Sequence, residues 1–475
     1  MIALLLILTP LVAGLLVFFL KQGSAAKNLA LVSSIAILAL ALVAVFAPVS
    51  PVYDASWLTN LGSRFTLKMD GMGKMLCLLT AIAYPLVFAA VYKNEYKNPA
   101  AFFGLMLLTQ AGLMGVFLAA DALLFYFFWE LALIPVYFLC SIWGGEKRIA
   151  VTFKFFVYTF IGSLLMLVGI LYVYFHTADQ SFAMESFYKV NLSTHQQSYI
   201  FWLFFVAFAI KMPIFPFHTW QPDTYEQSPT ATTVIMSAIM VKMGLFAIVR
   251  WLLPIFPEAS VQFANVIIVL SVIGMLYASL IAIRQDDLKR LIAYSSIAHI
   301  GLMCAALFTH NRTAMDGVMI QLFNHGINVI GLWILADLIE QKLGTRKLSE
   351  LGGLAQKAPV MAILLVVMAL ANVALPLTNA FIGEFLMFNG LFQFNVYMAA
   401  VAGISIILAA VYTLNMVQKI IYGEVNAVTA NAVDLAFNVK LVLVIIALVI
   451  IVFGVFPQPL IDLTKDSAAG LFLKK

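Results

Sequence analysis

Residues 209–250 read AIKMPIFPFHTWQPDTYEQSPTATTVIMSAIMVKMGLFAIVR, which is two apolar runs joined by a proline-rich turn. Each apolar run carries a lysine in its interior, Lys211 and Lys242. A lysine at the centre of a bilayer costs roughly 2.5–3.5 kcal/mol on insertion scales, so it needs a compensating environment. Prolines break helical hydrogen bonding, and inside a membrane such breaks line protein-buried or water-filled spaces. The stretch therefore predicts a polar path inside a helical membrane protein.

The composition of the whole chain agrees with a membrane protein. Hydrophobic residues make up 64% and charged residues 10% of its 475 residues, whereas soluble domains average about 25% charged residues. Long apolar runs without strand alternation predict spanning helices in an all-α fold rather than a barrel. The first twenty residues lack a basic start and a clear cleavage site, so we expect a retained first helix and not a signal peptide.

Several function classes are excluded by what the sequence lacks. The net charge of +5 is small for this length and gives no reason to expect a nucleic-acid partner. Cys77, Cys140 and Cys304 are far apart and form no CxxC pattern, so neither a metal or iron–sulfur site nor a disulfide framework is expected. No glycine-rich loop joins a strand to a helix, and no flavin or quinone motif is visible, so we expect no bound cofactor.

Apolar runs of about 20 residues, the length that crosses a bilayer, predict about fourteen spanning helices. They lie near 2–20, 28–47, 72–92, 100–119, 122–143, 152–175, 199–220, 229–253, 263–283, 291–308, 315–338, 358–392, 396–421 and 438–457. The twelfth run is too long for one straight span and contains Pro376, so two half-helices are expected there.

The distribution of lysine and arginine between the loops predicts the orientation. About 16 of these residues lie on one side, and about 9, including Lys74, Arg250, Lys474 and Lys475, lie on the other. The first set is placed in the cytoplasm, which leaves both termini on the non-cytoplasmic side of a bacterial inner membrane. The longest outer loops, 48–71 and 176–198, are too short for a soluble domain, and Asp54, Asp70 and Asp179 in them are expected to be solvated.

Two proline-interrupted helices, the seventh and the twelfth, lie five helices apart. Such a pair indicates two inverted repeats of five helices with the site at the breaks. The predicted organisation is residues 1–99 for helices 1–3, residues 100–253 for the first repeat (helices 4–8), residues 254–421 for the second repeat (helices 9–13), and residues 422–475 for the last loop, helix 14 and the tail.

Ionisable residues lie deep inside six different predicted helices. They are Glu130, Lys211, Lys242, His299, His325 and Glu384, and His218 lies in the proline-rich break. Ionisable groups at that depth line a hydrated cavity or pair with one another. Carboxylates, amines and imidazoles can each exchange a proton, so the set predicts a proton relay.

Glu130 and Lys211 are the pair expected to respond to each other. Opposite charges ~6 Å apart attract by roughly 2.8 kcal/mol at an effective dielectric of ~20. A small movement of Glu130 would therefore change how firmly Lys211 holds its proton. Structural alternatives stay open: Glu130 could bind a helix-end backbone group, either histidine could bridge two helices, and Glu384 could act as a cap. Lys242 lies about twelve residues from either end of its helix, too far to reach the interface.

At these residues the chain resembles the antiporter-like membrane subunits of respiratory complex I, which are similar to subunits of Mrp-type cation/proton antiporters. The motifs are WE with ALIPVYFL at Trp129 to Leu139, KFFVYTFIGS from Lys154, KMPIFPFHTWQPD with SPT between Lys211 and Thr230, VKMGLFAIVR around Lys242, DDLKRLIAYSSIAHIG from Asp286, and HGIN at His325. They span helices four to twelve in the order that the family shows.

The resemblance implies a proton-translocating subunit of NADH–quinone oxidoreductase whose redox chemistry lies in other subunits. It implies Glu130 and Lys211 as the modulating pair, Lys242 as the central lysine and Glu384, where sister subunits usually have lysine, as the terminal carrier. His299, His325 and His218 would be relay members. The implied partners are neighbouring antiporter-like and other membrane-arm subunits within the lipid bilayer. Tyr225 departs from the family, which often has a histidine near this position.

Two other functions stay open. An Mrp-type antiporter subunit, or its equivalent in a membrane-bound hydrogenase, has a similar core with different partners. A stand-alone transporter of an organic solute would need a pocket at the bilayer midplane with unwound backbone around the substrate. Acids and amines on successive helices favour protons as the transported species.

Overall fold

Helices make up most of the chain, whose computed structural model describes residues 1–469. In this described part, eleven helical stretches are at least 18 residues long and apolar enough to cross a membrane. They are α2 (Gly23–Val45), α3 (Gly71–Ala90), α4 (Pro99–Leu118), α5 (Ala122–Trp143), α6 (Arg148–His176), the stretch Thr230–Ile255, α13 (Pro257–Arg284), α14 (Leu288–Leu307), α15 (Arg312–Leu343), α19 (Val396–Ile421) and α20 (Phe437–Val455).

Shorter helices complete the bundle. They are α1 (Ile2–Phe18), α7 (Met184–Tyr188), α8 (Thr194–Lys211), α9 (Trp220–Gln227), α16 (Leu354–Lys357), α17 (Pro359–Asn372), α18 (Asn379–Phe394) and α21 (Gln458–Ala469), with 3₁₀ turns η1 (Thr59–Leu61) and η4 (Leu348–Glu350). Each of the fourteen expected runs contains helix. The total of fourteen spans and the two five-helix repeats stay predictions. The end of the predicted 422–475 segment, with Lys474 and Lys475, lies outside the described residues.

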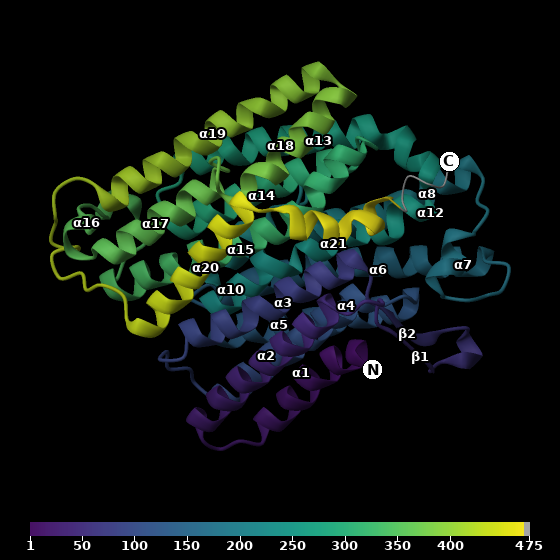
Figure 1. Cartoon of the computed structure of the whole chain (residues 1–475), viewed down its shortest axis with the longest axis horizontal. Helices are drawn as coiled ribbons and strands as arrows, with labels where there is room; N and C mark the ends of the chain where they lie inside the picture. Colours follow the sequence, from purple (N-terminus) through teal and green to yellow (C-terminus); the bar gives the residue numbers. More distant parts are fainter. Residues whose placement is uncertain (470–475) are drawn as a thin grey trace.

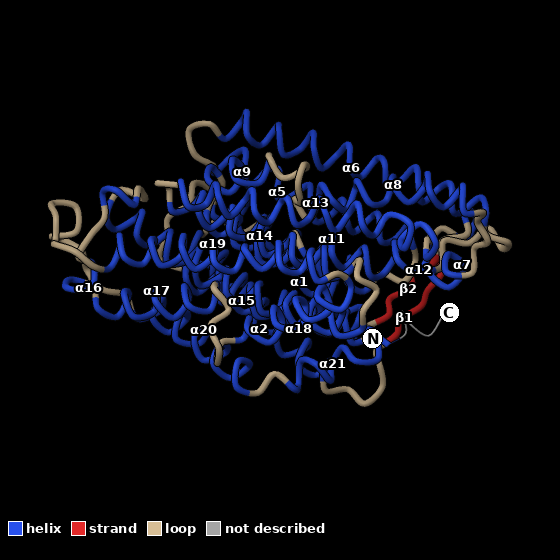
Figure 2. The backbone as a smooth tube through the Cα atoms, turned by 90° about the horizontal axis from the view of Figure 1, so that it is seen from above, coloured by secondary structure: helices blue, strands red, loops and turns tan. Residues whose placement is uncertain are grey.

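The long helices run side by side along the longest axis of the molecule. Figure 1 shows α1 and α2 along one edge and α19 along the opposite edge, with α21 lying across the face between them. The β-strands and α7 lie at one end of the bundle, and α16 lies at the other end (Figure 2). The centre is the most enclosed part, since the apolar windows of Thr230–Ile255 and of α15 are 100% buried. Lys242 and His325, which lie on these two elements, are therefore enclosed by protein.

Both proline-containing runs are broken, as the sequence predicts. α8 ends at Lys211, α9 begins at Trp220, and residues 212–219 between them contain two prolines, which cannot donate to a helical ladder. α17 ends at Asn372, and α18 begins at Asn379. In this second break Ala374 and Leu377 have positive φ angles of 56° and 73°, so the chain reverses its helical twist there.

The stretch Thr230–Ile255 alternates between two helix types. It consists of α10 (Thr230–Ile235), η2 (Met236–Met240), α11 (Lys242–Ala247), η3 (Ile248–Leu252) and α12 (Leu253–Ile255), where η2 and η3 are π-helical turns. π turns inside α-helices are rare and frequently lie at functional sites. Lys242 lies two residues after the end of the first of them.

One short β-hairpin lies at one end of the helical bundle (Figure 2), and the sequence did not predict it. Strand β1 (Val52–Ser56) pairs antiparallel with β2 (Arg64–Lys68). The Arg64 guanidinium pairs across the hairpin with Asp54, whose carboxylate also accepts a hydrogen bond from the Thr66 hydroxyl. Each strand has only five residues, too short for alternation to stand out from a polar loop.

Asp70 also differs from its expected solvated state, whereas Asp54 and Asp179 are exposed as expected. The Asp70 carboxylate caps α3 by accepting from the Gly73 amide at 3.0 Å. It also binds both terminal nitrogens of Arg250, at 2.6 and 2.7 Å. Arg250, which the sequence places at the outer end of the predicted span 229–253, belongs to η3 and is buried, so its charge draws Asp70 into the protein.

Candidate functional site

Lys242 occupies the buried centre of the molecule, with no exposed surface. Its Nζ donates to the Ser237 carbonyl oxygen at 2.8 Å and lies 2.8 Å from Nδ1 of His325 on α15. A protonated lysine can only donate, so His325 offers a lone pair at Nδ1 in this arrangement. The contact joins two helices that the sequence separates by 83 residues.

The π turn explains how Lys242 is held. In a regular α-helix the Val241 amide would donate to the Ser237 carbonyl, four residues earlier. Here the Val241 amide donates instead to the Met236 carbonyl at 3.1 Å. The Ser237 carbonyl is then available to the Lys242 ammonium. The π turn thus leaves the Ser237 carbonyl oxygen free to accept a hydrogen bond from the Lys242 ammonium.

Two further residues continue the contact from His325. The imidazole rings of His325 and His299, on α15 and α14, have centroids 5.6 Å apart. Nδ1 of His299 lies 3.0 Å from Oε1 of Glu384 on α18. All three side chains are buried, and Nε2 of each histidine has no hydrogen-bond partner among the described residues. The structure therefore brings together four of the seven expected site residues, in the order Lys242, His325, His299, Glu384.

Uncharged polar groups that the sequence did not single out surround the far end of this row. The Tyr412 hydroxyl and the Asn372 amide both donate to the Ser295 hydroxyl oxygen, at 3.0 and 2.9 Å. A cavity of about 20 Å³ is bordered by His299, Glu384 and Tyr412, enough for one water molecule. Ser295 precedes His299 by one helical turn, and this i, i+4 spacing could have indicated from the sequence that Ser295 lies beside His299.

Glu130 and Lys211 lie apart from this row, on α5 and α8. Lys211 is buried, and its Nζ lies 5.3 Å from the centre of the Trp129 ring, within cation–π range. Oε1 of Glu130 and Nζ of Lys211 are both buried without a hydrogen-bond partner among the described residues. The pair predicted to respond to each other is therefore not joined by a hydrogen bond in this structure.

His218 lies in the break between α8 and α9, as the sequence predicts. It is buried between aromatic rings, with centroids 5.7 Å from Phe215 and 5.2 Å from Tyr277. Its Nδ1 has no hydrogen-bond partner within the described chain. No hydrogen bond or ion pair joins His218 to the other expected site residues in residues 1–469. It stands separate from the row that begins at Lys242.

The row consists of side chains that can carry a proton. Its four members come from four helices, with contacts of 2.8 and 3.0 Å at its two ends and a distance of 5.6 Å between the centroids of the two imidazole rings. A buried cation in this position is stabilised by oxygen and nitrogen lone pairs rather than by water. The arrangement suits proton transfer between neighbouring side chains.

Comparison with known proteins identifies the family. A family model described as NADH:quinone oxidoreductase/Mrp antiporter, TM, matches residues 119–409, which include every residue of the row. The chain belongs to this family. It is therefore an integral, multi-pass membrane protein.

Relatives match over nearly the whole chain. NADH-quinone oxidoreductase subunit M of Rickettsia typhi is 35% identical over 422 residues, covering 88% of this chain and 85% of its own length. F(420)H(2) dehydrogenase subunit M of Methanosarcina mazei is 33% identical over 488 residues, covering 99% of this chain and 98% of its own. A chain of respiratory complex I from Thermus thermophilus superposes with a TM-score of 0.91 at 29% identity, covering 99% of this chain and 100% of that chain.

Proposed function

We propose that this chain is the subunit M of an NADH–quinone oxidoreductase and moves protons across the membrane while other subunits carry out the redox chemistry. The observation that carries the proposal is the continuous row from Lys242 to Glu384, with contacts of 2.8 and 3.0 Å at its two ends. The names of the similar subunits and the match to a complex I chain support the assembly.

A proton can pass along the row in three transfers. Protonated Lys242 gives its proton to Nδ1 of His325, which becomes an imidazolium. His325 then releases the proton on Nε2, and the neighbouring His299 accepts it at its own Nε2. His299 releases the proton on Nδ1 to the Glu384 carboxylate at 3.0 Å. Each histidine accepts on one nitrogen and releases from the other, which is how an imidazole shuttles protons.

Glu130 and Lys211 would control the loading of this row. When Glu130 is ionised and near, it stabilises the positive charge of Lys211, by roughly 2.8 kcal/mol at ~6 Å and an effective dielectric of ~20. When Glu130 moves away or is protonated, the buried ammonium loses that stabilisation and releases its proton. His218 would serve as a further relay member beside the break in the first repeat.

The expected topology extends the proposal. Fourteen spans with both termini on the non-cytoplasmic side place the Lys/Arg-rich loops in the cytoplasm. The breaks at residues 212–219 and 373–378 support two five-helix repeats, helices 4–8 and 9–13. Other membrane-arm subunits, including antiporter-like ones, would flank the chain. The Methanosarcina relative is named for a different electron donor, which agrees with donor chemistry outside this subunit.

The experiment compares variants in inside-out membrane vesicles, with NADH–quinone turnover and proton uptake measured together. Lys242→Ala and Glu130→Gln are expected to lower the protons moved per electron, because each removes a member of the relay or its control. Lys74→Ala is the matched control, since Lys74 is also a buried lysine on a spanning helix but binds only the carbonyls of Val45 and Ala47.

Unchanged proton movement in both relay variants would remove the relay assignment. Sodium-dependent proton movement without NADH would point instead to the Mrp-type alternative. Loss of subunit assembly in Lys242→Ala is monitored by the amount of this chain in the purified complex. If Lys242→Ala fails to assemble, the measurement is made with Lys242→Gln, which keeps a hydrogen-bonding side chain.

A further inference from the structure

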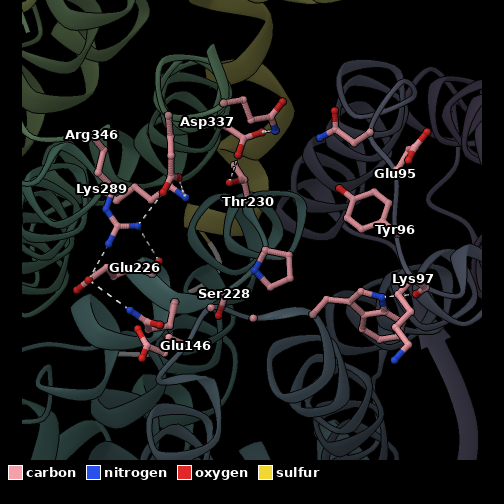
Figure 3. A pocket seen from close by; sticks show the side chains of 18 of the residues that line it. Glu95, Tyr96, Lys97, Glu146, Glu226, Ser228, Thr230, Lys289, Asp337 and Arg346 are labelled. Carbon is pink, nitrogen blue, oxygen red and sulfur yellow. Dashed lines mark hydrogen bonds and ion pairs between the residues drawn. The ribbon is translucent and has the colours of Figure 1, made fainter. Parts of the chain in front are cut away.

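A cavity of about 820 Å³ opens at the end of the bundle opposite the β-hairpin. Its walls come from the loop before α4, with Tyr96 and Lys97, and from Glu226, Lys289 and Arg346 on the other side (Figure 3). This end carries the Lys/Arg-rich loops, so the proposed topology places the cavity on the cytoplasmic side. The cavity is therefore in contact with the water from which protons would be taken.

Asp337 of α15 lies at the inner edge of this cavity. Its Oδ1 accepts from the Thr230 hydroxyl at 2.5 Å, and its Oδ2 accepts from the Gln341 amide at 2.7 Å (Figure 3). Four other acids line the cavity: Glu226 pairs with Arg290 and Arg346, Glu340 pairs with Lys289 and Arg346, and Glu95 and Glu146 are exposed. Among residues 1–469, Asp337 is the partly buried acid of this cavity that has only neutral hydrogen-bond donors and no ion pair, so it can take up a proton without breaking an ion pair.

Two side-chain contacts mark the two ends of the interface between the Thr230–Ile255 stretch and α15. Thr230 touches Asp337 at 2.5 Å, and Lys242 touches His325 at 2.8 Å. Lys242 follows Thr230 by twelve residues on one helical stretch, and Asp337 follows His325 by twelve residues on the other. Twelve residues correspond to about 18 Å of helix. The Thr230–Ile255 stretch and α15 thus run antiparallel from the cavity to the central lysine.

The interface is close and contains unpaired polar groups. A side-chain carbon at Gly326 would lie 3.0 Å from the Ala238 carbonyl oxygen, so only glycine lets α15 approach η2 this closely without a shift. Trp333, one turn from Asp337 on the same face of α15, is fully buried, and its Nε1 has no hydrogen-bond partner among the described residues. Thr232 Oγ1 on α10 is buried and unpaired too. Buried polar groups of this kind are satisfied by ordered water.

We propose that Asp337 is a proton-loading carboxylate that feeds the Lys242–His325 pair directly, through water held along the interface between the Thr230–Ile255 stretch and α15. The Asp337 carboxylate takes a proton from water in the cavity and becomes a neutral acid. It returns that proton to water on its inner side, and Lys242 or His325 accepts it when empty. This route does not pass Glu130 or Lys211. It rests on the proposed function, because it supplies the same row.

The first test uses vesicles of the intact complex carrying Asp337→Asn. The amide keeps the shape and the acceptor for Thr230 but cannot bind a proton, so protons moved per electron are expected to fall at least twofold. Asp337→Glu, which keeps the acid, is expected to restore most of the loss. Asp316→Asn is the matched control, since Asp316 lies near the other end of α15 and pairs only with Arg312. Equal values for Asp337→Asn and the control would overturn the proposal.

A second test separates the acid from the shape of the side chain. Asp337→Cys is alkylated from the cavity side with iodoacetate, which installs a carboxylate, or with iodoacetamide, which installs an amide of similar size. Iodoacetate alone is expected to restore proton movement. The three native cysteines of this chain are buried, and the unmutated complex treated in the same way corrects for cysteines of other subunits. Equal recovery with both reagents would show that Asp337 acts only structurally.

The outcome for Lys242→Ala distinguishes failure of the Asp337 entry from failure of the proposed function. If Lys242→Ala stops proton movement and Asp337→Asn does not reduce it, the relay stands and the Asp337 entry is wrong. If Lys242→Ala leaves proton movement unchanged, the proposed function itself fails. Because protons would enter the row by two routes, one through Asp337 and one through Glu130 and Lys211, the double variant Glu130→Gln/Asp337→Asn is expected to lose more proton movement than either single variant.

Discussion

Nζ of Lys242 lies 2.8 Å from Nδ1 of His325, across the interface between α11 and α15. This contact links the first half of the chain to the second, because Lys242 follows the first broken helix and His325 lies before the second one. In the proposed relay the path continues from His325 to His299 and Glu384. Replacement of any member should therefore interrupt the same path.

His325→Asn should stop proton movement without unfolding the chain. Asparagine can occupy the position and still accept a hydrogen bond from Lys242, but it cannot take up and release a proton near neutral pH. The protons moved per electron in vesicles are expected to fall to the level of Lys242→Ala. If His325→Asn pumps normally while Lys242→Ala does not, the proton leaves Lys242 by another route.

Glu384→Gln should impair proton movement as well. Glutamine keeps the contact with Nδ1 of His299 but removes the acceptor that takes up the proton at the end of the row. Glu258→Gln, in the first turn of α13, gives the comparison for a glutamate that contacts Thr194 and lies outside the row. Near-normal pumping in Glu384→Gln would leave this residue a structural role only.

Tyr412→Phe tests the polar surroundings of Glu384. The change removes the hydroxyl that donates to Ser295 at 3.0 Å and borders the small cavity beside Glu384. A typical hydrogen bond contributes about 1 kcal/mol, so a several-fold slower proton transfer with unchanged assembly is expected. Stopped-flow measurement of vesicle acidification gives the rate. A wild-type rate would show that the hydroxyl does not support the relay.

Asp70→Asn should destabilise the protein more than Asp54→Asn. Arg250 is buried, and the change leaves its guanidinium without a counter-charge. Breaking a fully buried pair costs about 3–5 kcal/mol, and because 23% of the Asp70 side chain is exposed we expect on the order of 2–3 kcal/mol. Asp54 pairs with Arg64 at the surface, where the loss is small. Thermal unfolding of the purified protein measures both, and equal Tm values for the two variants would contradict the burial of the Asp70–Arg250 pair.

The stability contributed by Asp223 should depend on pH. Burial raises the pKa of Asp223, but hydrogen bonds and charges from Lys154 and Arg290 outweigh it, so the pKa lies below its usual value. A lowered pKa in the folded state stabilises the protein at pH values above the unfolded pKa of about 3.9, and this gain is lost as the pH falls through the folded pKa. The Tm difference between the native protein and Asp223→Asn is expected to be constant near neutral pH and to shrink below about pH 4. A difference that grows on acidification would have the wrong sign.

The sequence allowed the titratable residues to be found but not their order. Lys211, Lys242 and Glu384 stand out because a charge in an apolar run is costly, and the prolines in residues 212–219 and at Pro376 predicted both breaks. The contact of His325 with Lys242, and of His299 with Glu384, depends on how four helices pack, which no local pattern records. Asp70 was misjudged for the same reason, because its partner Arg250 lies 180 residues away.

The most direct measurement is the number of protons moved per electron by the complex with Lys242→Ala, set against Lys74→Ala in the same vesicles. Lys242→Ala should reduce this ratio and leave NADH-driven electron transfer to quinone measurable, whereas Lys74→Ala should leave the ratio unchanged. An unchanged ratio in Lys242→Ala, with the subunit present in the complex, would contradict the relay from Lys242 to Glu384.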